Sequence, residues 1–130
     1  MPARILIIED DPASRELVRY LLNAAGHRVH LADDGGEALS VAALTDPDLI
    51  LCDLQMPIAD GYSVLLSLVR SPKWRGVPVI AVTAFSMPGD RDKVIAGGFT
   101  DYIAKPIDPE IFVAQVERFL PAALRQGSAS

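Results

Sequence analysis

Five short apolar runs, separated by segments of helical periodicity, leave this chain few possible folds. The runs have strand length and lie at 5–8, 29–31, 49–52, 79–82 and 102–104, and in the second the apolar Val29 and Leu31 alternate with polar neighbours. After the first run, Pro12 suits the first turn of a helix, and Gly26 suits its end. Strands that alternate with helices in this way indicate βαβ units, and therefore a parallel sheet covered by helices on both faces. We predict a single α/β domain.

The composition agrees with one soluble domain. The chain has 130 residues, which is enough for one core and too few for two. Its net charge of −5 argues against a nucleic-acid partner, which usually requires a basic face. No apolar run approaches the roughly 20 residues of a membrane span, and the start lacks the form of a signal peptide, so we expect a cytoplasmic protein. Cys52 cannot form an internal disulfide and is expected to be a small core residue.

Further helices are predicted after the second, third, fourth and fifth runs. Their apolar residues recur at helical spacing at 38–43, 64–69, about 90–96 and 112–120. We expect the domain to cover residues 1–124 and the tail, residues 125–130, to be disordered. The closeness of Met1 to the first strand favours a complete protein, and a domain cut from a larger protein is the alternative. His27 and His30 match no metal-ligand spacing and are expected to be solvated.

Polar residues follow four of the five apolar runs. In an open α/β sheet, ligands bind beyond the carboxyl ends of the strands, where the strand order reverses. A single polar residue there is most simply a helix cap or a loop residue, but the joint pattern is harder to explain by capping. The residues are Glu9, Asp10 and Asp11 after the first run, Asp53 after the third, Thr83 after the fourth and Lys105 after the fifth.

These groups suit a magnesium-dependent phosphoryl transfer. Clustered carboxylates repel one another unless a cation lies between them, and oxygen ligands suit a hard divalent ion such as Mg²⁺. The cluster contains no His or Cys, which disfavours zinc. A lysine can pair with a carboxylate and with a phosphate, and a threonine hydroxyl can bond to a phosphate oxygen. A carboxylate can then act as the nucleophile while the metal and the lysine neutralise charge.

The chain resembles the receiver domain of two-component response regulators from about Arg4 to Leu120. The stretches that carry the resemblance are "ILIIEDD", "DLILCDLQMPIADGYSVL", "VPVIAVTA" and "DYIAKPID". The resemblance implies a doubly wound (βα)5 domain with a five-stranded parallel sheet in the order 2-1-3-4-5. It also implies a signalling module that catalyses only its own phosphorylation and dephosphorylation. Asp53 would be the residue that accepts the phosphoryl group from a histidine kinase or a histidine phosphotransfer protein.

The resemblance also implies the ligands of the metal. Glu9 and Asp10 match the acidic pair of the family, with Asp10 as the direct Mg²⁺ ligand. Asp53 would bind the same ion, and Gln55 matches the position that supplies a backbone carbonyl. Asp11 lies one place further on, where the family varies, and we do not expect it to be a ligand.

Other family positions surround the acceptor. Thr83 and Lys105 match the hydroxyl and the amine that contact the phosphate. Pro106 matches a position that commonly follows a cis peptide bond, which would aim the lysine into the site. Ala84 would leave space for a docking kinase, and Phe85, together with Gln55, would help set the dephosphorylation rate.

The resemblance assigns a switch role to Tyr102, three residues before the lysine. When Thr83 moves toward the phosphate, Tyr102 would turn inward and change the surface around the fourth helix, the fifth strand and the fifth helix. Its simpler interpretation is a half-buried strand aromatic. Output would pass to an unidentified protein target, with the protein a monomer or a phosphorylation-dependent dimer. The first helix, with its exposed Arg15, Glu16 and Arg19, commonly docks the kinase in this family.

Two other functions share parts of this pattern. A Mg²⁺-dependent phosphohydrolase with an aspartyl nucleophile needs a second carboxylate two residues later, and this chain has Gln55 there. A flavin carrier of flavodoxin type needs a phosphate-binding loop after the first strand. The acidic run at 9–11 would repel a phosphate in that position unless a metal were bound.

Overall fold

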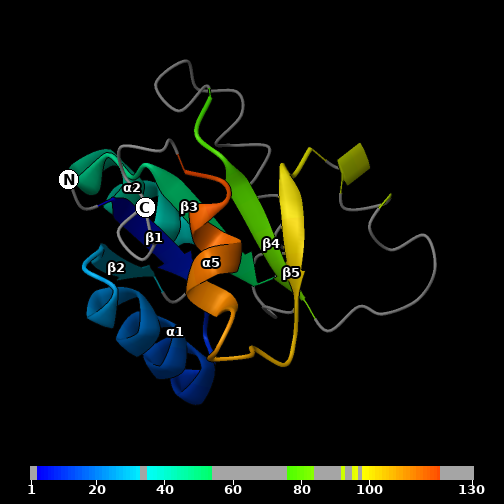
Figure 1. Cartoon of the computed structure of the whole chain (residues 1–130). Coiled ribbons are helices and arrows are strands. Elements are labelled where there is room, and N and C mark those ends of the chain that lie inside the picture. Colours follow the sequence, from blue (N-terminus) through cyan, green and yellow to red (C-terminus); the bar gives the residue numbers. More distant parts are fainter. Residues whose placement is uncertain are drawn as a thin grey trace.

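All five predicted strands form, and they lie in one parallel sheet (Figure 1). In this computed structural model the residues described are 3–32, 35–53, 76–83, 92, 95–96 and 98–120. The elements in chain order are β1 (Arg4–Ile8), α1 (Pro12–Ala24), β2 (Arg28–Ala32), α2 (Gly35–Thr45), β3 (Leu49–Asp53), β4 (Val79–Thr83), β5 (Asp101–Ala104) and α5 (Phe112–Glu117).

The strand order is β2-β1-β3-β4-β5, and each neighbouring pair is parallel. This confirms the predicted order and the α/β class. Strand β1 lies between β2 and β3, with Ile8 beside Ala32 on one side and Cys52 on the other. The chain therefore leaves β1 toward one edge of the sheet and later returns to its other side, so the strand order reverses between β1 and β3. Ligands of open α/β sheets bind at such a point.

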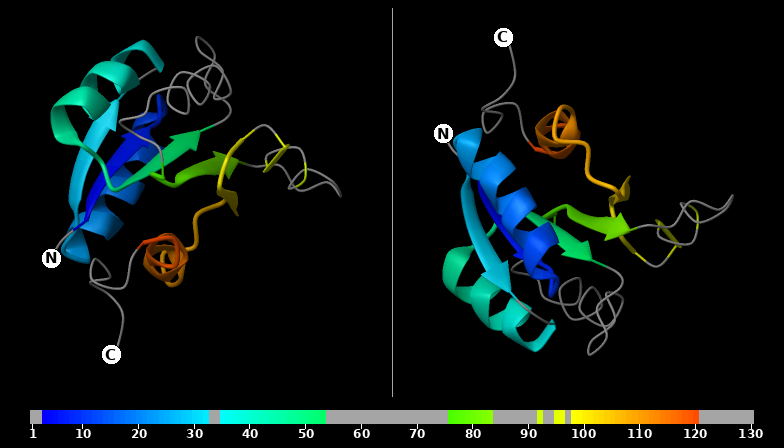
Figure 2. Two further views of the ribbon diagram at one scale, coloured as in Figure 1. Left: turned by 90° about the horizontal axis from the view of Figure 1, so that it is seen from above. Right: turned by 90° about the horizontal axis from the view of Figure 1, so that it is seen from below.

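Helices cover both faces of the sheet. Helices α1 and α5 lie on one face and α2 on the other (Figure 2). Successive strand residues point to opposite faces, so Ile5 and Ile7 pack with the α1/α5 layer, whereas Leu6 and Ile8 pack with the α2 layer. The central strands β3 and β4 are buried on both faces, which explains why they read as continuous apolar runs.

Local signals define the bounds of α1. Pro12 is its first residue, and the side chain of Asp11 accepts a hydrogen bond from the Ser14 N–H at 2.9 Å, which caps the helix. At the other end Gly26 has a φ of 96°, a left-handed conformation that glycine adopts without steric cost. This turn brings the chain directly back to begin β2.

Several predictions fall partly or wholly outside the described residues. The helix expected at 64–69 and the disordered tail at 125–130 lie outside them. Of the helix expected at about 90–96, residues 92, 95 and 96 are described and are helical. The prediction that Cys52 is a core residue is confirmed, because its side chain is buried and not in a disulfide. Among the residues described, no helix combines the length and apolar character needed to cross a membrane.

Candidate functional site

The sheet brings the polar strand ends together. Glu9 follows β1 and Asp53 ends β3, and these two strands are neighbours. Thr83 ends β4, where it lies beside Ala104 of β5, and Lys105 comes next along the chain. Four segments that are distant in the sequence therefore end at the same edge of the sheet, as the pattern of strand ends predicts.

Three carboxylates form a cluster at this edge. Glu9, Asp10 and Asp53 each offer an oxygen atom within 4.8 Å of the others. Glu9 and Asp53 are only 4% and 5% exposed, whereas Asp10 is open to solvent. The Oε2 atom of Glu9 is buried and has no hydrogen-bond partner among the described residues. A buried carboxylate oxygen without a partner, inside a cluster of oxygen ligands, fits a hard divalent cation such as Mg²⁺.

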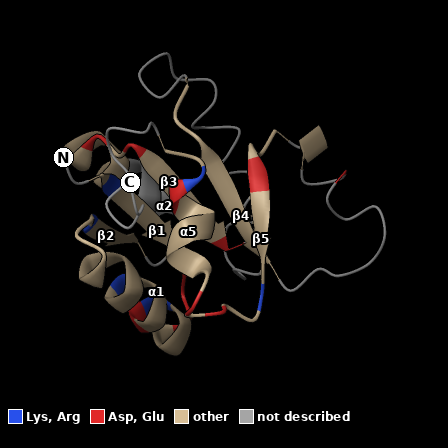
Figure 3. Ribbon diagram, viewed as in Figure 1, with Lys and Arg blue, Asp and Glu red and all other residues tan. Residues whose placement is uncertain are grey.

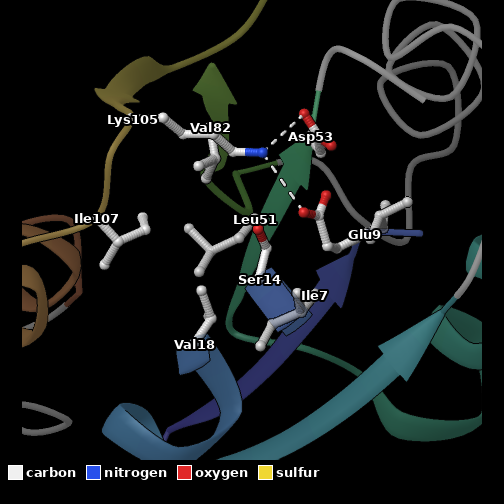
Figure 4. A pocket seen from close by; sticks show the side chains of 10 residues that line it. Ile7, Glu9, Ser14, Val18, Leu51, Asp53, Val82, Lys105 and Ile107 are labelled. Carbon is white, nitrogen blue, oxygen red and sulfur yellow. Dashed lines mark hydrogen bonds and ion pairs between the residues drawn. The ribbon is translucent and has the colours of Figure 1, made fainter. Parts of the chain in front are cut away.

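A lysine side chain opposes the carboxylates. The Nζ atom of Lys105 lies 3.4 Å from Oε1 of Glu9 and 3.5 Å from Oδ1 of Asp53 (Figure 4). Its side chain is 19% exposed, so water screens these pairs less than it would at the surface. Lys105 directly follows β5, and Asp108 and Glu110 lie between it and α5; Figure 3 colours basic residues blue and acidic residues red along the chain. One cation is thus shared between two buried carboxylates.

Glu9 is electrostatically the most perturbed of these groups. Burial, followed by the neighbouring carboxylate of Asp53, raises the pKa of Glu9 to about 8, although Lys105 acts in the opposite direction. This shift favours the protonated form of Glu9 when no metal is bound. Burial also raises the pKa of the Cys52 thiol to about 12, with smaller effects of Asp53 and Glu9, so this thiol stays protonated in the core.

Thr83 and Tyr102 lie on the same face of the sheet. Thr83 is completely buried at the end of β4. Tyr102 lies beside Ala81, two residues before Thr83, and its half-buried side chain packs on the core of the α2 layer. This arrangement gives the two side chains neighbouring positions on one surface of β4 and β5.

Of the remaining predicted site residues, the structure describes two and leaves three undescribed. The peptide bond between Lys105 and Pro106 is cis, as the resemblance implied. Asp11 caps α1 and is not part of the carboxylate cluster. Gln55, Ala84 and Phe85 lie outside the described residues.

The prediction that His27 is solvated is wrong. Its side chain is buried, and its Nε2 atom lies 2.7 Å from Oε2 of Glu117. No local sequence pattern indicates this pairing, because the two residues are 90 positions apart. His30 is half-buried in β2.

Two features of the site were not singled out from the sequence. Ser14 and Ile107 line a small, mostly apolar cavity beneath Glu9, Asp53 and Lys105. The position of Ser14 in the first turn of a helix that begins three residues after β1 was the available signal. A second, more open groove of about 380 Å³ lies alongside, lined by Ser14, Leu17, Lys105, Pro106 and Ile107.

Comparison with known proteins identifies one family. Residues 5–117 match the family described as response regulator receiver domain. The polar-differentiation response regulator DivK of Brucella anthropi is 39% identical over 120 residues, which cover 92% of this chain and 98% of that protein. An uncharacterised 14.6 kDa protein of Leptolyngbya boryana is 36% identical over 88% of each chain.

Solved structures of similar proteins have the same fold. The chemotaxis response regulator CheY4 of Vibrio cholerae superposes with a TM-score of 0.86 at 28% identity, covering 92% of this chain and 100% of that one. The receiver domain of a sensor histidine kinase from Pseudomonas aeruginosa has a TM-score of 0.81 at 34% identity, covering 92% and 98%. That structure has a magnesium ion coordinated in its active site cleft.

Proposed function

Because this chain belongs to the response regulator receiver domain family, we propose that it is the phosphoacceptor module of a two-component system or phosphorelay, with Asp53 as the acceptor. The observation that supports this most strongly is the position of the Asp53 carboxylate. It lies at the end of a buried central strand, 3.5 Å from the Lys105 amine and within 4.8 Å of two further carboxylates.

The reaction follows from these groups. An oxygen of the Asp53 carboxylate attacks the phosphorus of a phosphohistidine, a phosphorus–oxygen bond forms, and the phosphorus–nitrogen bond breaks. Lys105, which pairs with Asp53 in the structure, would pair with a phosphoryl oxygen after the transfer. Thr83 would bond to another of these oxygens. The protein acts as a substrate and a switch, and catalyses only its own phosphorylation and dephosphorylation.

Mg²⁺ is the cofactor that this donor set favours. Glu9, Asp10 and Asp53 would hold it, together with the backbone carbonyl of Gln55. The ion would neutralise the charge that accumulates on the transferring phosphoryl group. Glu9 must be ionised when the ion binds, so its proton leaves the site.

The output would be a change in the surface near β5. A phosphoryl group on Asp53 adds negative charge and hydrogen-bond acceptors beside Thr83. A movement of Thr83 toward the phosphate changes the space next to Tyr102, because both lie on one face of β4 and β5. Tyr102 turning inward would alter the face around β5 and α5 that a protein target contacts, or through which two copies pair.

The phosphate donor would be a histidine kinase or a histidine phosphotransfer protein that docks beside α1. The groove between α1 and the segment after Lys105 opens next to the acceptor. Leu17 is 36% exposed at its edge, and Tyr20, one helical turn later, is 67% exposed. Exposed apolar side chains around a groove at the reactive centre are typical of a protein-docking surface.

The test is a measurement of intact mass. Incubation with Mg²⁺ and a small phosphodonor such as acetyl phosphate should add one phosphoryl group, and Asp53→Asn should abolish the addition. Asp46→Asn is a matched control, because Asp46 is exposed, follows α2, and has a φ of 48° that asparagine also adopts readily. Labelling of the Asp53→Asn variant at the rate of the original protein would refute the assignment.

A further inference from the structure

A buried polar pair lies at the end of the sheet opposite the carboxylate cluster. His27 follows the turn that ends α1, and Glu117 is the last residue of α5. Their side chains are 0% and 5% exposed, and Nε2 of His27 lies 2.7 Å from Oε2 of Glu117. The proposed phosphorylation chemistry makes no use of either residue.

The hydrogen bonds determine which nitrogen of His27 carries the proton. The backbone N–H of Ala3, just before β1, donates to Nδ1 at 3.2 Å, so Nδ1 accepts. The ring proton is therefore on Nε2, which donates to the Glu117 carboxylate. The backbone of His27 is itself held, because its N–H donates to the carbonyl of Leu22 at 3.1 Å. Glu117 thus binds a ring whose position is determined by both α1 and β1.

This hydrogen bond gives α5 a directional restraint, which apolar packing does not. Helix α5 also rests on the sheet through the buried side chains of Phe112 and Val116, with buried Leu120 just beyond its end. Apolar burial is non-directional, so it holds a helix against a sheet without fixing its position along the axis. A buried hydrogen bond is directional, and breaking it leaves a polar group without a partner in the core. Glu117 therefore fixes the carboxyl end of α5.

The opposite end of α5 is held differently. The helix begins at Phe112, a short distance along the chain from Lys105, and its N-cap residue Ile111 makes no side-chain capping bond. The backbone N–H of Phe112 donates to the carbonyl of Asp108 in the preceding turn. This end is thus connected to the carboxylate cluster through a short segment, whereas the other end is bonded to the far side of the sheet.

We propose that the His27–Glu117 pair is an anchor that fixes the carboxyl end of α5 to the start of β1, so that α5 moves only at the end nearer Lys105. The anchor itself is a property of the fold. Its consequence for signalling, a response confined to one end of α5, depends on the proposed function.

The anchor can be tested by hydrogen exchange of backbone amides in the full chain. Glu117→Met removes the acceptor at similar side-chain length, and Glu117→Gln retains a weaker, neutral acceptor. Glu110→Met is the matched control, because it makes the same change at an exposed position near the other end of α5. We expect amides at 115–117 to exchange at least about tenfold faster in Glu117→Met, with Glu117→Gln intermediate and Glu110→Met unchanged.

Amides of β1 and β3 serve as the internal reference and should keep their original rates. Equal acceleration of these strands and α5 would overturn the proposal, because the pair would then stabilise the whole domain and not one helix end. Exchange at 115–117 that is no faster than in Glu110→Met would also overturn it. If Glu117→Met fails to fold, Glu117→Gln is judged by the same two criteria.

A second arm adds Mg²⁺ and beryllofluoride, a mimic of the phosphoryl group. In the original protein, exchange should change at 105–112 and stay constant at 115–117, and in Glu117→Gln the change should extend to 115–117. A change at both ends of α5 in the original protein would overturn the proposed confinement. No change anywhere would count against the proposed function, while the first arm would still decide whether the anchor exists.

Discussion

The protonation of Glu9 makes a quantitative prediction about stability and pH. The pKa of Glu9 is raised from 4.5 to about 8 in the folded protein, mainly by burial and then by Asp53. The unfolded chain loses this proton near its ordinary pKa, so between these two pH values the folded state binds more protons than the unfolded state. The contribution of Glu9 to the free energy of unfolding therefore falls as pH rises from 4.5 to 8, and this loss is complete above pH 8.

The magnitude follows from the pKa difference. Each pKa unit corresponds to 1.36 kcal/mol, so ionised Glu9 lowers the free energy of unfolding by at most about 5 kcal/mol. The measured loss should be smaller, because Lys105 and Asp53 rearrange and water enters the site. Glu9→Gln keeps the size of the side chain without its charge. We expect this variant to be more stable than the original protein at pH 8.5 and to lose that advantage toward pH 5.5.

The assay is urea unfolding without metal, in EDTA, at several pH values from 5.5 to 8.5. Comparing the two proteins at each pH cancels the contributions of groups that they share, provided the slope against urea is unchanged. Mg²⁺ should then stabilise the original protein more than the Gln variant. A stability difference that is constant over this range, or that has the opposite slope, would show that Glu9 is ionised at neutral pH and would refute the reasoning.

Three further changes test other parts of the molecule. Lys105→Ala should leave phosphorylation of Asp53 possible but abolish the change of conformation at Tyr102 that follows it. A normal change in Tyr102 fluorescence or side-chain NMR signals after addition of phosphodonor would contradict the role of Lys105. Leu17→Gln should slow phosphoryl transfer from a histidine phosphotransfer protein about fivefold or more without affecting labelling by acetyl phosphate. The control is Leu44→Gln, at a position 86% exposed on α2, which should change neither rate. Equal effects of the two substitutions on the transfer rate would refute docking beside α1. Leu49→Ala, at a completely buried position, should reduce the free energy of unfolding by about 2–5 kcal/mol, whereas Leu44→Ala should reduce it by less than about 0.5 kcal/mol. Similar losses for the two variants in urea unfolding would contradict the burial of β3.

The sheet was predictable because its central strands β3 and β4 are buried on both faces. A run such as Leu49–Cys52 has no polar residue that could face water, so only a central strand accommodates it. The meeting of Glu9, Asp53 and Lys105 then follows from topology alone, since carboxyl ends of parallel strands share an edge. Residue identity and strand position were sufficient here, and no side-chain detail was needed.

The details that escaped prediction depend on side-chain geometry between distant segments. Nothing near His27 in the sequence indicates that its ring is buried, because its partners are the backbone of Ala3 and the carboxylate of Glu117. Similarly, the strand-end pattern places Lys105 near carboxylates but does not predict that it pairs with Glu9 as well as with Asp53. Such pairings depend on where a helix rests on the sheet, which local periodicity does not determine.

Two sets of buried polar residues in the described part of the chain illustrate opposite relations between stability and function. At the amino-terminal edge of β1, His27 and Glu117 satisfy one another, so their burial costs little and fixes a helix end. At the carboxyl edge, Glu9 keeps an oxygen without a partner and a pKa far above its ordinary value. A site that was fully satisfied without a ligand would gain nothing from binding one. Under the proposed function, a bound cation would partner this unsatisfied carboxylate, and cation and phosphoryl group together would change the energy of this edge of the sheet as a switch requires.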